Sequence, residues 1–270
     1  MQITDKVFVV TGGGNGIGRE VVLGLLSRGA RVAALDLREA SLQETAALAT
    51  VPEGRLSLHT VDVSSQDEVT RAFAEVVSAH GHIDGLLNVA GIIQQFVPLL
   101  ELDIAEIEKV MGVNFWGVVY TTKAALPHLV TRPEACVINV ASMGGFIPVP
   151  GQSAYGASKA AVKLLTEGLY AELRGTDIAV TIVFPGAIGT DITKNSGVAS
   201  PGSTDRTEDG GSFRMTSAQD AAAEIIEAVE KGPFRMTIGR DAAMLDRLSR
   251  LAPQRATEMI AKKMASLLDR

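Results

Sequence analysis

A cluster of glycines that follows the first apolar run constrains this chain more than any other feature. The run VFVV at 7–10 is followed at once by TGGGNGIG at 11–18 and then by helix-compatible residues. The glycines therefore lie where a strand passes into a helix, whose N-terminus would offer free amides and a positive dipole end to a pyrophosphate. Gly12, Gly16 and Gly18 have the spacing TGxxxGxG, longer than the common GxGxxG. Turns also use glycines for steric reasons alone, so the cluster needs support from its surroundings.

Short β-branched runs alternate with helix-like stretches along most of the chain. We expect strands at 6–10, 31–36, 55–62, 83–89, 135–142, 179–184 and 234–238, and helices at 16–27, 39–49, 66–79, 104–128, 153–173 and 218–230. Several strands, such as VINVAS and VTIVF, are apolar at nearly every position, which indicates burial on both faces. The pattern predicts an α/β fold: a single Rossmann-like, doubly wound parallel sheet of about seven strands flanked by helices.

The composition is that of a globular protein with one sizeable core. Of 270 residues 46% are hydrophobic and 21% charged, and no linker or charge block divides them, so we expect a single domain over 1–270. The net charge of −6 and the lack of a basic tract argue against a nucleic-acid partner. No apolar run approaches bilayer length and the N-terminus lacks the h-region of a signal peptide, so we expect a cytoplasmic protein without membrane contact.

The cysteine and histidine content argues against disulfide and metal chemistry. Cys136 is the single cysteine and has no partner for a disulfide or a thiolate metal site, which fits a reducing compartment. The four histidines show no ligand spacing such as HExxH, so we expect no metal site.

An acidic residue ends the second predicted strand. Asp36 stands about where a carboxylate would meet the ribose diol of an adenosine, and it would repel a 2′-phosphate. The glycine turn carries no basic residue, since Gly14 and Asn15 stand there. These charges favour NAD over NADP. Arg38, two residues later, leaves NADP open because a basic side chain could reach a phosphate.

The segment YGASK places Tyr155 and Lys159 four residues apart on one face of a predicted helix. A phenol is a poor base at neutral pH, but a nearby ammonium favours its phenolate and so lowers its pKa. Ser142 ends the strand VINVAS, where its hydroxyl could hydrogen-bond a substrate oxygen. A Tyr and Lys at this spacing are also common on helix surfaces, and a serine at a strand end can be a simple turn former.

Taken together, these motifs resemble the short-chain dehydrogenase/reductase family. The shared elements are TGGGNGIG, Asp36, NVAG at 88–91, Asn114, Ser142, YGASK and PGAIGT at 185–190, in that family's order. The resemblance runs from about residue 6 to 190, its general architecture extends to about 240, and the remainder is generic.

The resemblance implies roles for individual residues. Tyr155 would be the general acid/base and Ser142 would hold the substrate oxygen. Lys159 would lower the pKa of the tyrosine and bind the nicotinamide ribose, and Asn114 would position a water that links the lysine to solvent. Asn114 could instead cap a local backbone turn. The implied cofactor-binding set is Gly12, Asn15, Gly16, Ile17, Gly18, Asp36, Leu37, Asp62, Val63, Asn88, Ala90, Gly91, Tyr155, Lys159, Pro185, Gly186, Ile188 and Thr190, with Asn88 weighted toward a structural role.

The function that this resemblance implies is hydride transfer between NAD(H) and a secondary alcohol or ketone. We expect the segments 144–152 and 92–96 and the loop in the 190s to line the pocket. Side chains such as Ile92, Ile93 and Phe146, with few charges nearby, favour an apolar substrate, and Gln94 and Gln152 are the candidate polar readers. Such apolar residues are also common in cores. The alternatives are an NADP-dependent 3-oxoacyl reductase and a non-catalytic dinucleotide-binding protein.

Two segments fall outside the alternating pattern. Residues 191–216 are rich in Gly, Ser, Thr and Asp, and we expect a mobile surface loop that acts as a lid over substrate or is a tolerated insertion. Residues 240–270 carry an apolar helical stripe interrupted at Pro253. This extension would pack against a neighbouring subunit or over the substrate loop, with membrane attachment as the lesser alternative. The resemblance also implies a homo-oligomer, a tetramer or dimer.

Overall fold

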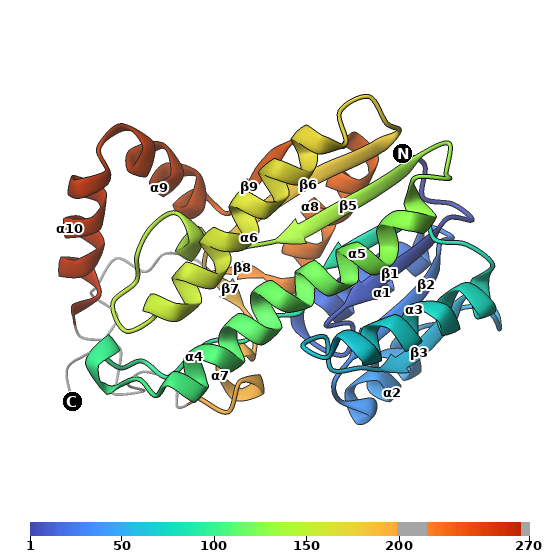
Figure 1. The fold of residues 1–270 in the computed structure, drawn as a ribbon, viewed down its shortest axis with the longest axis horizontal. Helices are drawn as coiled ribbons and strands as arrows, with labels where there is room; N and C mark the ends of the chain where they lie inside the picture. The colour runs from blue at the N-terminus through green and yellow to red at the C-terminus, as the bar shows by residue number, and fades with distance from the viewer. Residues whose placement is uncertain (199–214, 266–270) are drawn as a thin grey trace.

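A seven-stranded parallel sheet forms the centre of the molecule (Figure 1). The computed structural model describes residues 1–198 and 215–265. The strand order is β3-β2-β1-β4-β5-β6-β9, and every neighbouring pair is parallel. The bounds are β1 (Val7–Thr11), β2 (Arg31–Asp36), β3 (Leu56–Thr60), β4 (Gly85–Asn88), β5 (Ala135–Val140), β6 (Ile178–Pro185) and β9 (Arg235–Ile238). The predicted Rossmann-like, doubly wound sheet is confirmed.

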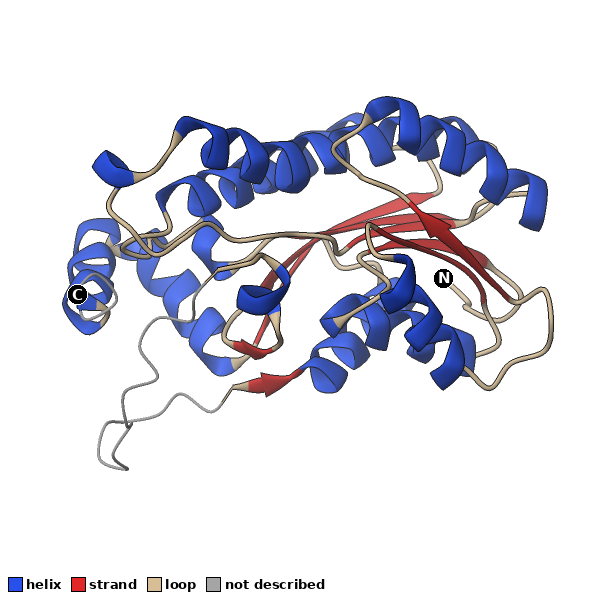
Figure 2. Cartoon of the chain, turned by 90° about the horizontal axis from the view of Figure 1, so that it is seen from below, coloured by secondary structure: helices blue, strands red, loops and turns tan. Residues whose placement is uncertain are grey.

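Helices cover both faces of the sheet, which lies between them when seen from below (Figure 2). On one face α1 packs against α8, and on the other α3 packs against α5. The helices are α1 (Gly16–Ser27), α2 (Glu39–Leu48), α3 (Gln66–His80), α4 (Ile104–Met111), α5 (Gly117–Leu129), α6 (Ser153–Glu172), α7 (Ile192–Asn195), α8 (Ala218–Lys231), α9 (Arg240–Leu251) and α10 (Pro253–Lys263). The single helix expected over 104–128 is instead α4, the π-helical turn η2 (Gly112–Trp116) and α5.

The strands are apolar at consecutive positions because each face of the sheet has its own core. Successive side chains of a strand point to opposite faces. In β1, Val10 packs with Leu25 in the core under α1 and α8, whereas Val9 packs with Phe73 in the core under α3 and α5. All five residues of β1 are buried. The hydrophobic effect thus selects a continuous apolar run rather than an alternating one.

The order of the strands creates one switch point. The chain moves outward from β1 through β2 to β3, and then returns to the other side of β1 as β4. The connections that leave the carboxyl ends of β1 and β4 therefore diverge, and a crevice opens between them. The glycine turn follows β1 and the segment NVAG begins at the end of β4, so both motifs lie at this crevice.

The two irregular segments are partly described. The end of the 191–216 segment contains β8 (Thr216–Ser217), which pairs with β7 (Ile188–Gly189), and its start contains α7. Residues 199–214 lie outside the described part of the chain, and the mobility of this loop and the single-domain organisation stay predictions. The predicted C-terminal helices are α9 and α10, with Pro253 as the first residue of α10, and 266–270 lie outside the described residues.

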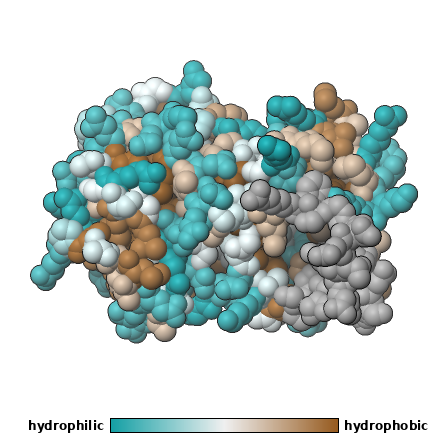
Figure 3. Space-filling view, turned by 180° about the vertical axis from the view of Figure 1, so that it is seen from behind, coloured by the Kyte–Doolittle hydropathy of each residue, from teal (hydrophilic) through white to brown (hydrophobic). Residues whose placement is uncertain are grey.

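The surface offers apolar side chains in separate patches, and the face seen from behind is mostly hydrophilic (Figure 3). Part of the C-terminal stripe packs against its own chain, since Leu245, Ala256 and Ile260 are buried with Ile147. Leu251 of the same stripe is 86% exposed, so the stripe is only partly covered. Within residues 1–198 and 215–265, no helix has the length and apolar character to span a bilayer.

A buried carboxylate fixes the amino end of the sheet. Asp84, which is fully buried, precedes β4 and accepts a hydrogen bond from the backbone amide of Val7 at 2.9 Å. The amide of Val7 bonds to Oδ2, and Nε2 of His82 lies 3.1 Å from the same oxygen. Oδ1 accepts from Nε of Arg132 at 2.8 Å. Asp84 therefore joins β1, β4 and the segment before β5.

Replacing Asp84 with alanine is expected to lower the free energy of unfolding by about 3–5 kcal/mol, because the Arg132 guanidinium and the Val7 amide lose their buried acceptor. Urea unfolding followed by circular dichroism measures the change. Glu227→Ala is the control, since that carboxylate pairs with Lys231 on the surface of α8. Its effect is expected to stay within about 0.5 kcal/mol, and an equal effect of both variants would contradict the prediction.

Candidate active site

The glycine turn after β1 is a close contact between backbones. Gly12 has φ +71°, and a Cβ there would lie 3.0 Å from Cα of Ala90, across the crevice. A Cβ on Gly18 would lie 2.1 Å from the carbonyl oxygen of Gly12. Neither position can carry a side chain without moving the backbone, so the glycines hold the turn against the first turn of α1. The amides of Ile17 and Gly18, in that first turn, have no acceptor within the helix.

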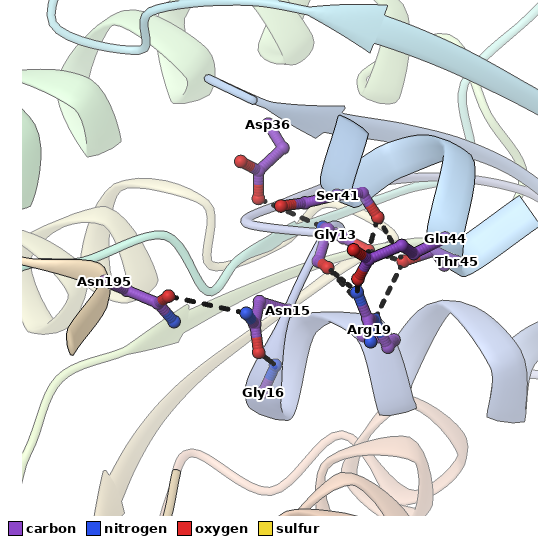
Figure 4. Close-up of polar contacts among 10 residues, drawn as sticks. Gly13, Asn15, Gly16, Arg19, Asp36, Ser41, Glu44, Thr45 and Asn195 are labelled. Carbon is purple, nitrogen blue, oxygen red and sulfur yellow. Dashed lines mark hydrogen bonds and ion pairs between the residues drawn. The ribbon is translucent and has the colours of Figure 1, made fainter. Parts of the chain in front are cut away.

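Polar side chains lock this turn in place (Figure 4). Oδ1 of Asn15 caps α1 by accepting from the amide of Gly16 at 2.6 Å. Arg19 donates from Nε and its terminal nitrogen to the carbonyl of Gly14, and it also pairs with Glu44 at 2.6 Å. The guanidinium is thus occupied by the turn and by α2. Arg19 therefore serves as a clamp, rather than as a basic group open to a ligand.

Asp36 lies beside the turn at the end of β2. Its Oδ2 accepts from the amide of Gly14 and its Oδ1 from the amide of Arg38, both at 3.0 Å. These bonds fix the carboxylate at the edge of the crevice, where it also lines the cleft described next. Leu37, beside it, is 65% exposed and offers an apolar surface at the same edge.

One cleft of about 360 Å³ collects nearly all the predicted site residues. Of these, Asn88 and Asn114 do not line it, although both lie directly behind it. The predicted residues that line the cleft are Gly12, Asn15, Gly16, Ile17, Gly18, Asp36, Leu37, Asp62, Val63, Ala90, Gly91, Ser142, Tyr155, Lys159, Pro185, Gly186, Ile188 and Thr190.

Asn88 does not line the cleft and its side chain has a structural role, and its assignment to the cofactor-binding set stays a prediction. Its side chain is buried and donates to Oδ1 of Asn139 at 2.8 Å, while its own Oδ1 accepts from Thr121 at 2.8 Å. Asn139 in turn donates to Thr166 of α6 at 2.9 Å. This polar seam joins β4 and β5 to α5 and α6 behind the cleft, and a fully satisfied buried network of this kind specifies one packing arrangement.

Tyr155, Ser142 and Lys159 converge at the floor of the cleft. Nζ of Lys159 lies 6.0 Å from the centre of the Tyr155 ring and donates to the carbonyl of Val140 at 3.0 Å. A Cβ on Gly144 would lie 3.3 Å from Cε1 of Tyr155 and 3.5 Å from Oγ of Ser142, so this glycine lets the two side chains approach each other. The sequence prediction that these three residues share one site agrees with this geometry.

The protonation of this group differs from the expectation. Burial raises the pKa of Tyr155, and a side-chain hydrogen bond with Ser142 opposes that rise only in part. Burial also lowers the pKa of Lys159 to about 8. The predicted lowering of the tyrosine pKa by the ammonium is therefore wrong for this state, because burial raises that pKa and the opposing cause is the hydrogen bond with Ser142, not the charge of Lys159. Tyr155 holds its proton here.

Asn114 occupies the π-helical turn between α4 and α5, fully buried. Its Oδ1 accepts from the amide of Ile92, and its Nδ2 donates to the carbonyl of Ile92 and to Ser158, all at 2.9 Å. A Cβ on Gly91 would lie 3.1 Å from Nζ of Lys159 and 3.3 Å from Oδ1 of Asn114. The asparagine thus caps the local backbone beside the lysine. Its role in a water relay stays a prediction.

Gln94 and Gln152 do not line the cleft, and their role as polar readers of substrate stays a prediction. Gln94 is fully buried, accepts from the amide of Tyr155 at 3.0 Å and donates to the carbonyl of Gly151 at 3.0 Å. Gln152 donates to the carbonyl of Gln94 at 2.8 Å. Because α6 begins without a side-chain cap of its own, Gln94 supplies the missing acceptor from another loop and orients the end of α6 that carries Tyr155.

Several lining residues were not assigned to the site from the sequence. Ile92 and Ile93 line the cleft as expected for the substrate side, whereas Phe146 packs against the ring of Phe184 and does not line it. Asn195 of α7 reaches across to Asn15, with 3.4 Å between Oδ1 and Nδ2. The sequence signal that could have identified Asn195 is its position after the carboxyl end of β6, the edge of the sheet where the cleft lies. The other unassigned lining residues are Arg38, Val61, Val89, Val113, Val140, Ala141 and Ile192.

Comparison with known proteins identifies the family. Residues 6–200 match the model of the short chain dehydrogenases. This chain is a short-chain dehydrogenase/reductase. As a member of this family it is an oxidoreductase with a dinucleotide-binding fold.

Individual relatives agree with this assignment over nearly the whole chain. SadH of Mycobacterium tuberculosis, named as an oxidoreductase, is 34% identical over 265 residues, covering 96% of this chain and 95% of SadH. A short-chain dehydrogenase/reductase from Burkholderia phymatum, solved in complex with NAD, matches with a TM-score of 0.82 and 25% identity over 95% of this chain and 97% of that one. A short-chain dehydrogenase from Burkholderia cenocepacia, solved in complex with NADP, matches with a TM-score of 0.78 and 25% identity over 98% of this chain and 99% of that one.

The buried lysine makes the stability of this protein depend on pH. The folded protein releases the Lys159 proton near pH 8, whereas an unfolded chain holds it to about 10.5. Between these values the unfolded state binds more protons, so the contribution of Lys159 to the free energy of unfolding rises with pH, by up to about 3 kcal/mol. Below pH 8 the cost of burying the ammonium is present in full.

Urea unfolding of the wild type and of Lys159→Met from pH 7 to 10 tests this titration. As the pH rises above 8, the free energy of unfolding of the wild type should increase relative to that of Lys159→Met. Lys163→Met is the control, because Lys163 lies one turn further along α6 in a part-exposed pair with Glu167. A pH-independent difference for Lys159→Met would contradict the assigned titration.

Proposed function

We propose that this chain is an NAD(H)-dependent oxidoreductase that interconverts a secondary alcohol and a ketone on an apolar substrate. The observation that carries the proposal is that Tyr155, Ser142 and Lys159 share one cleft with the glycine turn and Asp36. A binding protein without catalytic activity would not need a phenol, a hydroxyl and a buried amine at one point of that cleft. The catalytic set proposed is Tyr155, Ser142 and Lys159, with Asn114 supporting the lysine.

The cleft fits a dinucleotide on the evidence of its backbone. Gly16, Ile17 and Gly18, the first residues of α1, line the cleft, and the amides of Ile17 and Gly18 have no acceptor within the helix, so they are available to a pyrophosphate. Asp36 would hold the adenosine ribose, and Pro185, Gly186, Ile188 and Thr190 would line the nicotinamide end. A bound nicotinamide supplies the hydride.

The side chains then handle the proton and the substrate oxygen. Ser142 and Tyr155 would hold that oxygen between their hydroxyl groups, since Gly144 lets them approach. Because burial keeps the Tyr155 phenol protonated, the chain is prepared in this state to donate a proton to the oxygen of a ketone during reduction. The Lys159 ammonium would stabilise the phenolate while it develops. Transfer of an ammonium proton would then restore the phenol and leave a neutral amine, which takes up a proton from solvent.

The walls of the cleft support an apolar substrate. Ile92, Ile93, Val113 and Ile192 line it, whereas Gln94 and Gln152 do not line it and donate to backbone carbonyls. Of the charged side chains that line the cleft, Asp36, Arg38 and Asp62 lie at or just after the ends of β2 and β3, and Lys159 donates to the carbonyl of Val140. The wall beside Ile92 and Ile93 therefore offers a charged substrate few partners. A sugar or an acid would leave its polar groups unpaired there.

NADP is the second candidate cofactor. Arg38 is exposed at the cleft, and no partner for its guanidinium occurs among the described residues. Relatives of the same fold have been solved with NAD and with NADP. We favour NAD because the Asp36 carboxylate, held by two backbone amides, cannot turn away from a 2′-phosphate without losing both bonds.

Tyr155→Phe is expected to lower kcat by about 10²–10⁴-fold, because the phenylalanine cannot transfer a proton. The assay follows nicotinamide absorbance with a panel of secondary alcohols and their ketones. Tyr170→Phe is the control, since Tyr170 lies at the far end of α6 and packs against Phe234. NADH binding without turnover on any member of the panel would favour the non-catalytic alternative.

Asp36→Ala is expected to reduce the preference for NADH over NADPH by about tenfold or more, because it removes the charge that repels the 2′-phosphate. Fluorescence titration with each dinucleotide measures the two dissociation constants. Glu39→Ala, which removes an exposed carboxylate at the start of α2, should leave the ratio unchanged. Tighter NADPH than NADH binding by the wild type would overturn the cofactor assignment.

A further inference from the structure

The loop from Pro185 to Thr190 is held from the C-terminal extension by one carboxylate. Oδ2 of Asp241, in the first turn of α9, accepts a hydrogen bond from the amide of Ala187 at 2.8 Å. We propose that Asp241 is a positioning residue for the nicotinamide end of the cleft, acting through this loop. The inference rests on the proposed function, because it assumes that the loop contacts a nicotinamide.

Two glycines make room for this carboxylate. A Cβ on Gly186 would lie 2.3 Å from Oδ1 of Asp241, and a Cβ on Gly239 would lie 2.5 Å from the same oxygen. The carboxylate therefore fills the space of two absent side chains, one on the loop and one just before α9. Gly239 also has φ +92°, a conformation that favours glycine. A longer side chain than that of Asp241 would collide with the backbone at Gly186 or Gly239, and a shorter one would leave the space beside them empty.

Other contacts hold the loop at its two ends, and Asp241 holds it between them. The amide of Gly186 donates to the carbonyl of Ile238 at 2.9 Å, which continues the pairing of β6 with β9. The carbonyl of Ala187 accepts from the amide of Thr216 at 3.0 Å, beside the pairing of β7 with β8. The Ala187 amide points the other way, to Asp241. The peptide groups on both sides of Ala187 are therefore held by hydrogen bonds, the preceding one by Asp241 and the following one by Thr216.

The helix that carries Asp241 is itself anchored. Asp246, one turn and a half along α9, accepts hydrogen bonds from Arg235 of β9 and from Arg250. Leu245 packs with Ile147, Ala256 and Ile260 where α9 and α10 meet the segment after Ser142. A side chain on a helix fixed in this way can transmit a rigid position to the loop. This assigns to the C-terminal extension a role in shaping the cleft.

Three variants separate the geometry of Asp241 from its charge. Asp241→Ala removes the acceptor, and Asp241→Asn keeps an oxygen that can face the Ala187 amide. Asp241→Glu keeps the charge and the helix but extends the side chain into the space beside Gly186 and Gly239. Glu258→Ala is the matched control, because Glu258 is an exposed carboxylate of α10 that hydrogen-bonds to Gln254.

Two measurements are made on each full-length variant. The first is amide hydrogen exchange of the ligand-free protein over 185–190, which reports the tether without any cofactor. The second is the dissociation constant of NADH against that of ADP-ribose, which lacks the nicotinamide. We expect Asp241→Ala and Asp241→Glu to speed exchange over 185–190 and to weaken NADH about tenfold, with ADP-ribose within about twofold. Asp241→Asn should stay close to the wild type.

The outcomes are distinct. Equal weakening of NADH and ADP-ribose, or faster exchange throughout the protein, would show a general structural role and overturn the inference. Unchanged NADH binding in Asp241→Ala would overturn it as well. NADH binding by Asp241→Glu as tight as that of the wild type would also overturn it. A wild type that binds ADP-ribose but not NADH would instead overturn the proposed function, while the exchange measurement would still show whether Asp241 tethers the loop.

Discussion

Burial of the sheet on both faces is the constraint on which the rest of this structure depends. The neighbouring residues Val9 and Val10 of β1 point into different cores, so neither face of this strand is open to water. Polar chemistry is then excluded from the length of the strands and is possible where they end. The divergence of the connections after β1 and β4 opens a crevice at one such edge, and that is where Gly12, Asp36 and Ser142 lie.

The same dryness sets the protonation of the reacting group. Lys159 is 3% exposed, and its amine has the carbonyl of Val140 as its hydrogen-bond partner rather than a carboxylate. Burial lowers the pKa of this lysine to about 8 and raises the pKa of Tyr155, so the phenol keeps its proton. Under the proposed function, Tyr155 could donate this proton to a substrate oxygen without first changing its own charge.

Most of the fold and of the cleft could be predicted from the sequence, because both follow from local patterns. Apolar runs predict buried strands, and the carboxyl end of each strand is marked by its last residue, as with Asp36 and Ser142. What could not be predicted depends on burial and on free backbone groups, which only the tertiary structure creates. Desolvation raises the pKa of Tyr155, where the sequence predicted a lowered value. The side chain of Asn88 hydrogen-bonds to Asn139 behind the cleft, and the side chain of Gln94 accepts a hydrogen bond from the uncapped start of α6, 61 residues along the chain. The π-helical turn at Asn114 interrupts a periodicity that reads as one helix.

The two halves of the cleft are built by different means. On the dinucleotide side the shape comes from backbone, since the tightest contacts at Gly12 and Gly18 are with backbone atoms of Ala90, Gly12 and Gly13. On the side of Tyr155 the arrangement depends on a side chain from another element, since Gln94 accepts a hydrogen bond from the amide of Tyr155 at the start of α6. Under the proposed function, substitutions among such side chains would change the substrate end of the cleft while the glycine turn keeps its geometry. A fold of this design can therefore serve different substrates without losing the dinucleotide site.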